Sequence, residues 1–191
     1  FYADRSMAFG SGEFKPTEDL ALSVRKITRQ ASKRIARAAF EAARTRRKKV
    51  TAVHKGNVLK VSDGMFMEAV ETVASEYPDV ELESIIVDAM AALLVRSPET
   101  FDVIVTTNMY GDILSDEASE LAGSLGLAPS LNAGDTIAMA QAQHGSAPDI
   151  AGQDKANPTS LILSMAMLLE WLGRRHNIVA LSDAASAVEK A

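Results

Sequence analysis

The sequence contains no cysteine, and only one of its 191 residues is a tryptophan. Without cysteine the chain can form no disulfide framework, no thiolate zinc site and no thiol nucleophile. Any metal ion must therefore be held by oxygen or imidazole ligands. The absence also fits a reducing compartment, and a chain of this length with 47% hydrophobic residues can bury a sizeable core.

A basic excess is also missing, because 25 acidic side chains outnumber 20 basic ones and give a net charge of −5. Proteins that bind the phosphate backbone usually concentrate basic residues on one face, so we expect no nucleic-acid partner. No apolar run reaches the roughly 20 residues that span a bilayer, and the first residues do not resemble a signal peptide. We therefore expect a cytoplasmic protein without a membrane partner. Because the chain begins at Phe1, we also expect it to be part of a longer polypeptide.

Segments of strand and helix character alternate along the chain, which predicts an α/β architecture. After a Gly-rich arm over residues 1–16, strands are expected at 21–28, 50–53, 80–87 and 101–106. Helices are expected at 29–47, 62–76, 89–95, 113–121 and 157–175, with another starting near 182. The stretch 127–152 is rich in Gly, Pro, Ala and Asp, which predicts a long functional loop with one strand near 137–141.

Polar or charged residues are expected at the start of one of these helices and at the end of another. Ser62 or Asp63 is expected to cap the helix at 62–76. The helix at 29–47 ends in a basic cluster, namely Arg44, Arg46, Arg47, Lys48 and Lys49. The cluster could bind an anion, but cations in the last turn of a helix complement its dipole, and we favour that interpretation.

An acidic pair follows the strand at 101–106, where its side chains should emerge at the carboxyl edge of the sheet. Asp112 and Asp116 are four residues apart, a spacing that puts both carboxylates on one face of a helix. Two hard oxygen ligands on a rigid backbone suit Mg²⁺ or Mn²⁺. The alternative is that Asp112 only caps the helix and Asp116 is solvated.

Two more charged residues follow strands of the same predicted sheet. Asp88 comes after the strand at 80–87, and Lys55 comes after the strand at 50–53. Asp88 could be a third metal ligand or the N-cap of the next helix. Lys55 could be a general base or an ordinary surface charge. Because ligands collect where such strands end, the three strand ends together favour a site.

These residues lie in motifs that closely resemble the isocitrate and isopropylmalate dehydrogenase family, the β-decarboxylating hydroxy-acid dehydrogenases. The motifs occur in the family's order and approximate spacing, at Val53–Leu59, Val87–Met90, Phe101–Val105, Gly111–Asp116 and His144–Gly152. The resemblance implies an α/β, isopropylmalate dehydrogenase-like two-domain fold, with central mixed sheets flanked by helices and an extended intersubunit arm. The implied parts are an arm and entry strand at 1–28, a central metal-binding and dimerisation domain at 29–125, and a return to the first domain at 126–191.

The resemblance also implies the chemistry of the site. Asp88, Asp112 and Asp116 would bind Mg²⁺ or Mn²⁺, which chelates the hydroxyl and carboxylate of the substrate. Lys55 would act as base toward that hydroxyl while hydride leaves for nicotinamide. Tyr2, which matches the family's catalytic tyrosine, would protonate the enol after loss of CO₂, although it could also be only an aromatic residue of the arm.

The family's cofactor-binding residues match a second set of positions. Asn57 corresponds to a position near nicotinamide, although it could be only a turn-forming residue. The adenosine half would lie against His144, Gly145, Ser146, Ala147, Pro148, Asp149 and Asn157. A carboxylate at Asp149 accepts hydrogen bonds from a free 2′-hydroxyl and repels a 2′-phosphate, which predicts NAD over NADP. Alternatively, Asp149 only shapes a turn.

By the same resemblance, Lys55 and Asp88 complete the site of a neighbouring subunit, so the protein is expected to be a homodimer with shared active sites. The expected substrate is a small hydroxy acid, 3-isopropylmalate first, with isocitrate and homoisocitrate as alternatives. The family's substrate-selecting arginines belong to a segment that the sequence does not contain. A different kind of function, a non-catalytic regulatory subunit of a hetero-oligomer, also stays open.

Overall fold

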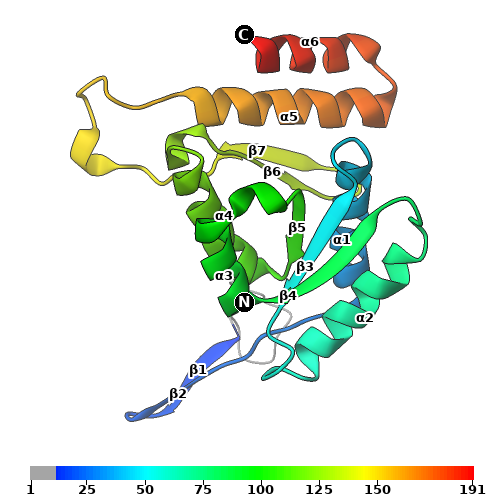
Figure 1. Cartoon of the computed structure of the whole chain (residues 1–191). Helices are drawn as coiled ribbons and strands as arrows, with labels where there is room; N and C mark the ends of the chain where they lie inside the picture. The colour runs from blue at the N-terminus through cyan, green and yellow to red at the C-terminus, as the bar shows by residue number, and fades with distance from the viewer. Residues whose placement is uncertain (1–11) are drawn as a thin grey trace. The chain divides into compact units, whose positions relative to one another are not determined.

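The computed structural model describes residues 12–191, in which helices alternate with strands (Figure 1). The chain divides into two compact units, Phe1–Ser115 and Asp116–Ala191, and the boundary in the sequence falls within helix α4 (Asn108–Leu121). The three-part division expected from the resemblance, with a boundary after residue 125, stays a prediction. Within residues 12–191 no helix is long and apolar enough to cross a membrane.

The first unit begins with a two-stranded antiparallel ribbon. Strand β1 (Glu13–Thr17) pairs with β2 (Leu20–Ser23), and the backbone N–H of Val24 closes the ribbon on the carbonyl of Gly12 at 2.7 Å. Nearly all residues of both strands are exposed. The ribbon agrees with the extended arm expected near the start of the chain, although β2 ends at Ser23, before the expected 28.

A three-stranded parallel sheet forms the centre of the first unit, in the order β4 (Glu81–Ile86), β3 (Lys49–His54) and β5 (Val103–Thr106). Because side chains alternate along a strand, Val50 and Ala52 of β3 belong to one apolar cluster and Val53 to another. β3 is therefore buried on both faces, as expected of a central parallel strand.

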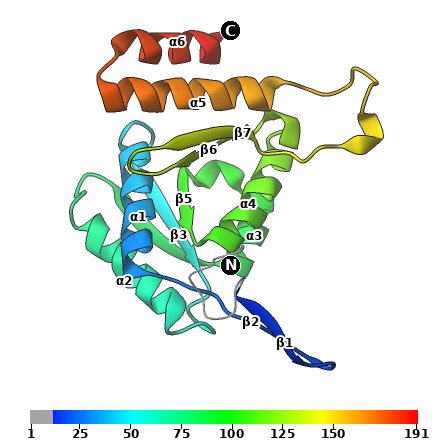
Figure 2. The ribbon, with the colours of Figure 1, turned by 180° about the vertical axis from the view of Figure 1, so that it is seen from behind.

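Helices cover both faces of this sheet. Helices α1 (Arg29–Arg44) and α2 (Ser62–Ala74) lie side by side and contribute Phe40, Phe66 and Val70 to the first cluster (Figure 2). Helix α3 (Val87–Arg96), joined to β4 without a loop, contributes Met90 and Leu94 to the second cluster. The apolar spacing of the sequence predicted all three helices within a few residues.

Helix α1 ends at Arg44, so only this member of the basic cluster lies in the last turn. The other members pair with acids from other elements: Arg46 lies 2.9 Å from Asp102, and Lys49 lies 3.0 Å from Glu83. The helix-dipole interpretation therefore holds for Arg44 alone. Neutralisation by acidic neighbours, which the sequence did not reveal, accounts for the rest and argues against an anion site.

The expected cap of helix α2 is wrong, and so are the capping alternatives for Asp88 and Asp112. Helix α2 has Val61 at its N-cap with no side-chain hydrogen bond, and Asp63 is fully buried inside its first turn. Asp88 lies inside the first turn of α3, and Asp112 lies more than a turn into α4, which begins at Asn108. Helices α3 and α4 begin earlier than expected, whereas α2 begins at Ser62 as expected and has its N-cap one residue before, so none of these carboxylates caps its own helix.

The second unit combines a β-hairpin with two helices. Strands β6 (Pro129–Ala133) and β7 (Ala138–Ala142) pair antiparallel where a long loop with one strand was expected. Helix α5 (Thr159–His176) packs on the hairpin through buried Ser160 and Ser164, and Ser164 Oγ accepts the Ser130 N–H at 3.0 Å. Small side chains let the helix approach the strands closely.

Helix α5 ends at His176, and the chain turns at Asn177, which has a left-handed φ of 54°. Helix α6 (Val179–Lys190) then packs against α5. A methyl group on Gly173 would meet Ser182 Oγ at 2.5 Å, so the absence of a side chain permits this close approach. The helix expected from residue 182 is confirmed, but it begins at Val179, directly after the extended residue Ile178.

Candidate active site

Lys55 and Asp88 come together at the carboxyl edge of the parallel sheet. Lys55 follows β3, and Asp88 follows β4, which pairs with β3 in parallel register. The Lys55 ammonium forms an ion pair with the Asp88 carboxylate. The hydrogen bond from Lys55, together with backbone bonding, holds the pKa of Asp88 below its ordinary value. Strand topology therefore brings together two of the residues expected at the site.

The turn that carries Lys55 is held by several bonds. Its backbone N–H donates to Asp63 Oδ2 at 2.6 Å, and its carbonyl accepts the N–H of Leu59 at 2.8 Å. His54 Nδ1 accepts the N–H of Gly56 at 2.9 Å, so Nε2 carries the ring proton and donates to Ser84 Oγ. Asn57 is exposed in the same turn. The fold therefore fixes the backbone of the expected base.

Asp112 and Asp116 lie one turn apart on α4, as their spacing predicted, and both are exposed. Asp116 is more than a solvated carboxylate, because Gln143 Nε2 donates to its Oδ1 at 2.9 Å. Helical geometry makes the two acids neighbours on one face. Their like charges favour a cation between them, and their hard oxygens suit Mg²⁺ or Mn²⁺.

Within residues 12–191, no three acidic or histidine side chains lie close enough together to hold a metal ion. Asp88 is paired with Lys55, whereas the helical pair forms a separate set. The carboxylate chemistry fits a hard divalent cation, but this chain provides the expected ligands as two groups. Tyr2, the remaining catalytic candidate, lies outside the described residues.

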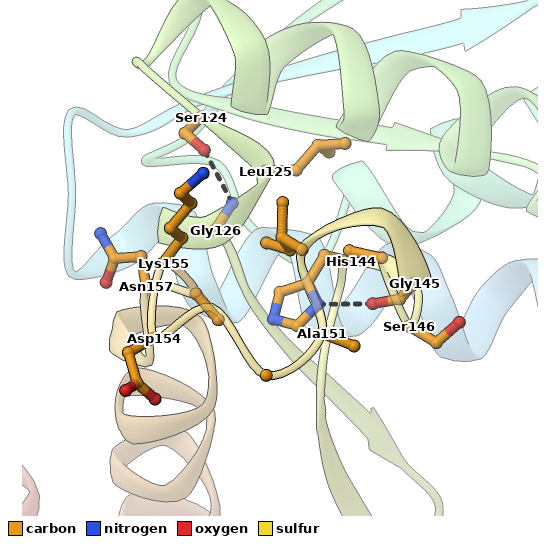
Figure 3. Close-up of a pocket in the computed structure, with 14 residues that line it drawn as sticks. Ser124, Leu125, Gly126, His144, Gly145, Ser146, Ala151, Asp154, Lys155 and Asn157 are labelled. Atoms are coloured by element: carbon orange, nitrogen blue, oxygen red, sulfur yellow. Dashed lines mark hydrogen bonds between the residues drawn. The ribbon is translucent and has the colours of Figure 1, made fainter.

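A pocket of about 680 Å³ lies in the second unit, between a Gly-rich stretch and the loop that follows β7 (Figure 3). Its volume is in the range of small-molecule and cofactor sites. Five of the residues expected to bind the adenosine half of a cofactor line it: His144, Gly145, Ser146, Ala147 and Asn157. Nδ1 of His144 donates to the carbonyl of Gly145 at 2.8 Å.

Pro148 and Asp149 border this pocket in sequence but are not among its lining residues. They open the short helix η3 (Pro148–Ile150), which follows Ala147 in a left-handed conformation with φ of 41°. The Asp149 side chain is exposed, and its carbonyl accepts a hydrogen bond from Gln153 Nε2 at 2.7 Å. The carboxylate of Asp149 is therefore exposed beside the pocket, and its expected contact with a ribose stays a prediction.

Sequence reasoning missed the two charged residues of the pocket. Lys155 and Asp154 both line it, and Figure 3 shows the Lys155 side chain reaching toward Ser124 and Gly126. Ser124 Oγ accepts the Gly126 N–H at 3.1 Å. The signal was present in the Gly-rich stretch 123–126 and in the two charges just before Asn157. A lysine in such a pocket can attract an anionic group of a ligand.

Comparison with known proteins identifies the family. Residues 2–191 match the model of the isocitrate/isopropylmalate dehydrogenase family. Homoisocitrate dehydrogenase of Methanocaldococcus jannaschii is 52% identical over 86% of this chain and 47% of its own length. Isocitrate dehydrogenase [NADP] of Rickettsia bellii is 46% identical over 94% of this chain and 36% of its own length.

The crystal structure of isocitrate dehydrogenase from Methylococcus capsulatus superposes with a TM-score of 0.84 at 46% identity, covering 93% of this chain and 52% of that one. This likeness confirms the expected α/β fold class. The chain spans about half the length, or less, of the proteins that it matches. It belongs to the isocitrate/isopropylmalate dehydrogenase family.

Proposed function

We propose that the protein containing this chain catalyses the metal-dependent oxidative decarboxylation of a 2-hydroxy acid that bears a 3-carboxylate, with hydride transfer to NAD. Membership of the family supports an oxidoreductase that acts on a CH–OH group. The observation that carries the proposal is the Lys55–Asp88 pair, a base candidate held beside a metal-ligand candidate at the edge of the sheet. A cytoplasmic location stays a prediction.

In the proposed reaction, the neutral amine form of Lys55 accepts the proton of the substrate hydroxyl as hydride leaves the carbon, and Lys55 becomes an ammonium again. Asp88, Asp112 and Asp116 would hold Mg²⁺ or Mn²⁺, and the positive charge of the ion would favour ionisation of that hydroxyl. The ion pair with Asp88 keeps the Lys55 ammonium at the sheet edge before substrate binds. Tyr2 donates the proton that completes the product after CO₂ is lost.

The proposed assembly is a homodimer in which Lys55 and Asp88 of one chain complete the site that contains Asp112 and Asp116 of the other. Two observations support it. The described part of one chain contains no group of three acidic side chains placed to hold a metal ion, and the ribbon of β1 and β2 presents exposed residues suited to an intersubunit arm. Shared sites would make dimerisation obligatory for activity.

A mixed-dimer experiment tests the sharing of sites directly. Lys55→Met and Asp116→Asn full-length proteins are each expected to be nearly inactive as homodimers. Co-expressed at equal levels, half of the dimers are mixed, and each mixed dimer contains one intact site and one doubly defective site. We expect about a quarter of wild-type activity to return, because one site in four is then intact. If co-expression returns no activity, the sites are not shared in this way.

We propose NAD as the cofactor, bound with its adenosine half in the pocket of the second unit. The carboxylate of Asp149, in the turn beside Ala147, would repel a 2′-phosphate. Lys155 acts in the opposite direction because its ammonium lines the same pocket. The ratio of kcat/KM for NAD and NADP decides between these two influences, and a ratio below one would overturn the assignment to NAD.

For the substrate we propose 3-isopropylmalate first, with isocitrate and homoisocitrate as alternatives. The family includes enzymes for each, and the relatives at 46–52% identity do not separate them. The deciding measurement follows NAD reduction by the full-length protein with these three acids and malate in the presence of Mn²⁺, with EDTA as the control. Absence of turnover, or turnover that EDTA leaves unchanged, would contradict the proposed reaction and favour a regulatory subunit.

A further inference from the structure

Asp63 is a fully buried carboxylate that the proposed chemistry does not use. A buried charge is costly unless it is paired and hydrogen-bonded. Both oxygens of Asp63 have a partner: Oδ1 forms an ion pair with Arg25, and Oδ2 accepts the backbone N–H of Lys55 at 2.6 Å. The carboxylate therefore acts on the turn eight residues before it and leaves the start of its own helix uncapped.

Arg25 extends this connection to a third segment. Its side chain is 15% exposed, and its guanidinium nitrogens lie 3.4 Å from both Thr107 Oγ1 and Tyr110 Oη. The guanidinium carbon also lies 5.2 Å from the centre of the Tyr110 ring, in the geometry of a cation–π contact. Thr107 and Tyr110 flank the beginning of α4, the helix that carries Asp112 and Asp116.

We propose that Asp63 and Arg25 are positioning residues, together called the Arg25–Asp63 clamp, that hold the Lys55 turn in register with the start of α4. The inference rests on the proposed function of Lys55. The ammonium of Lys55 sits at the end of a flexible four-carbon stem, so its position depends on where its backbone is held as well as on the ion pair with Asp88. The clamp fixes that backbone through the Lys55 N–H and ties it to the segment leading into the acidic pair.

A polar pair in this place has a cost that an apolar pair would avoid, since burying two charges removes them from water. Leucine at position 63 could fill the space beside Phe66 and Val70 of the same helix, but it could not accept the Lys55 N–H. The retained bond points to control of geometry as the role of the clamp. Misplacing a catalytic group by about 1 Å can reduce turnover by about 100-fold.

The test compares Asp63→Asn with wild type in the full-length protein. Asparagine can still accept one hydrogen bond, but it leaves the Arg25 guanidinium without its counter-charge. We expect kcat to fall by about 10- to 100-fold while KM for the hydroxy acid and for NAD changes less than about 3-fold. Hydrogen exchange at the amides of residues 55–59 should become faster by about 10-fold.

Glu68→Gln is the matched control, because Glu68 lies on the same helix and pairs with Arg29 at 2.8 Å on the exposed surface. It should leave kcat and amide exchange unchanged. A merely structural role for Asp63 would lower the melting temperature without this split between kcat and KM. A folded Asp63→Asn protein with wild-type exchange and wild-type kcat would overturn the proposal.

Arg25→Lys provides a second variant if Asp63→Asn does not fold. Lysine keeps a positive charge for Asp63 but cannot contact Tyr110 and Thr107 with a planar fork. We expect kcat to fall by about 3- to 10-fold, and an unchanged kcat would overturn the coupling to α4. If the wild-type protein shows no turnover, the proposed function fails by itself. Amide exchange at residues 55–59 then decides whether the clamp anchors the turn.

Discussion

The Lys55 turn and the loop from His144 to Asn157 carry the two halves of the proposed chemistry, and they are held in different ways. Bonds to the buried Asp63 and to neighbouring backbone groups anchor the Lys55 turn. The hydrogen bonds of the later loop are largely local, such as those from His144 to Gly145 and from Gln153 to Asp149. The base is therefore placed by the fold, whereas the cofactor loop has few contacts that would resist adjustment to a ligand.

This difference predicts that changes in the Lys55 turn act mainly on kcat and changes in the cofactor loop mainly on KM. Removal of the base should have the largest effect. Lys55→Met is expected to lower kcat by about 10²- to 10⁴-fold, because no other group takes the hydroxyl proton. Lys60→Met, at an exposed lysine just beyond the same turn, is the control and should stay near wild type. A Lys55→Met enzyme with more than a tenth of wild-type kcat would contradict the assigned role.

The metal carboxylates come next in expected effect. Asp116→Asn should weaken Mn²⁺ binding by about 10- to 100-fold, since it replaces a charged oxygen ligand with a neutral one. Calorimetric titration of the full-length protein with Mn²⁺ measures this change without any turnover. Asp135→Asn, at an exposed acid between β6 and β7, serves as the control. Equal Mn²⁺ affinity in the Asp116 variant and wild type would remove Asp116 from the proposed ligands.

A change in the cofactor loop tests the other side of the comparison. Asp149→Lys should raise the preference for NADP over NAD by about 10-fold, because it exchanges a repulsive charge for an attractive one near the 2′-position. Most of the change should appear in KM, with kcat altered less than about 3-fold. An unchanged preference would show that Asp149 only shapes the turn, as its exposed position and backbone bond already permit.

A fourth variant separates the stability of the sheet from the placement of the Lys55 turn. Asp102 precedes β5, at the opposite edge of the sheet, and its side chain is buried. Burial opposes its ionisation, but Arg46 and backbone N–H groups lower its pKa. Asp102→Asn should reduce the free energy of unfolding by about 1.5–3 kcal/mol with little change in kcat. Denaturant unfolding of both proteins measures the difference.

The pH dependence of this difference has a defined sign. A carboxyl with a lowered pKa in the folded state stabilises the protein above its unfolded pKa of about 3.9, and this contribution is lost as pH falls through the folded value. Wild type and Asp102→Asn should therefore converge in stability below about pH 4. A stability difference that persists unchanged in acid would assign the effect to packing instead of charge.

Apolar periodicity was sufficient to predict β3, β5 and helices α1 to α3. It was insufficient for β6, whose sequence Pro129–Ala133 has no β-branched residue. That strand forms because β7 pairs with it and because Ser160 and Ser164 of α5 fit closely against the hairpin. A partner such as Ser164, which lies 34 residues from Ser130 in sequence, leaves no local pattern at the strand itself.

The candidate site shows the same division between features set by nearby residues and features set by distant ones. The motifs placed Lys55, Asp88, Asp112 and Asp116 at strand ends or on one helix, because the end of a strand and the period of a helix are local properties. They did not distinguish a capping acid from a buried one. Asp63 was expected to cap its own helix, yet Arg25 lies 38 positions earlier in the chain and draws the carboxylate inward. Lys155 was missed because lining a pocket depends on the Gly-rich stretch on its opposite side.

The sequence by itself determined the alternation of strands and helices, the helical spacing of Asp112 and Asp116, and the motifs of the family. Each of these depends on residues close together in the chain. The tertiary structure decided that Lys55 meets Asp88, that the basic cluster is neutralised, and that Asp63 anchors the Lys55 turn. These outcomes depend on packing between distant segments. Burial makes an ion pair necessary for Asp63, whereas the pairing of β3 with β4 places Asp88 beside Lys55.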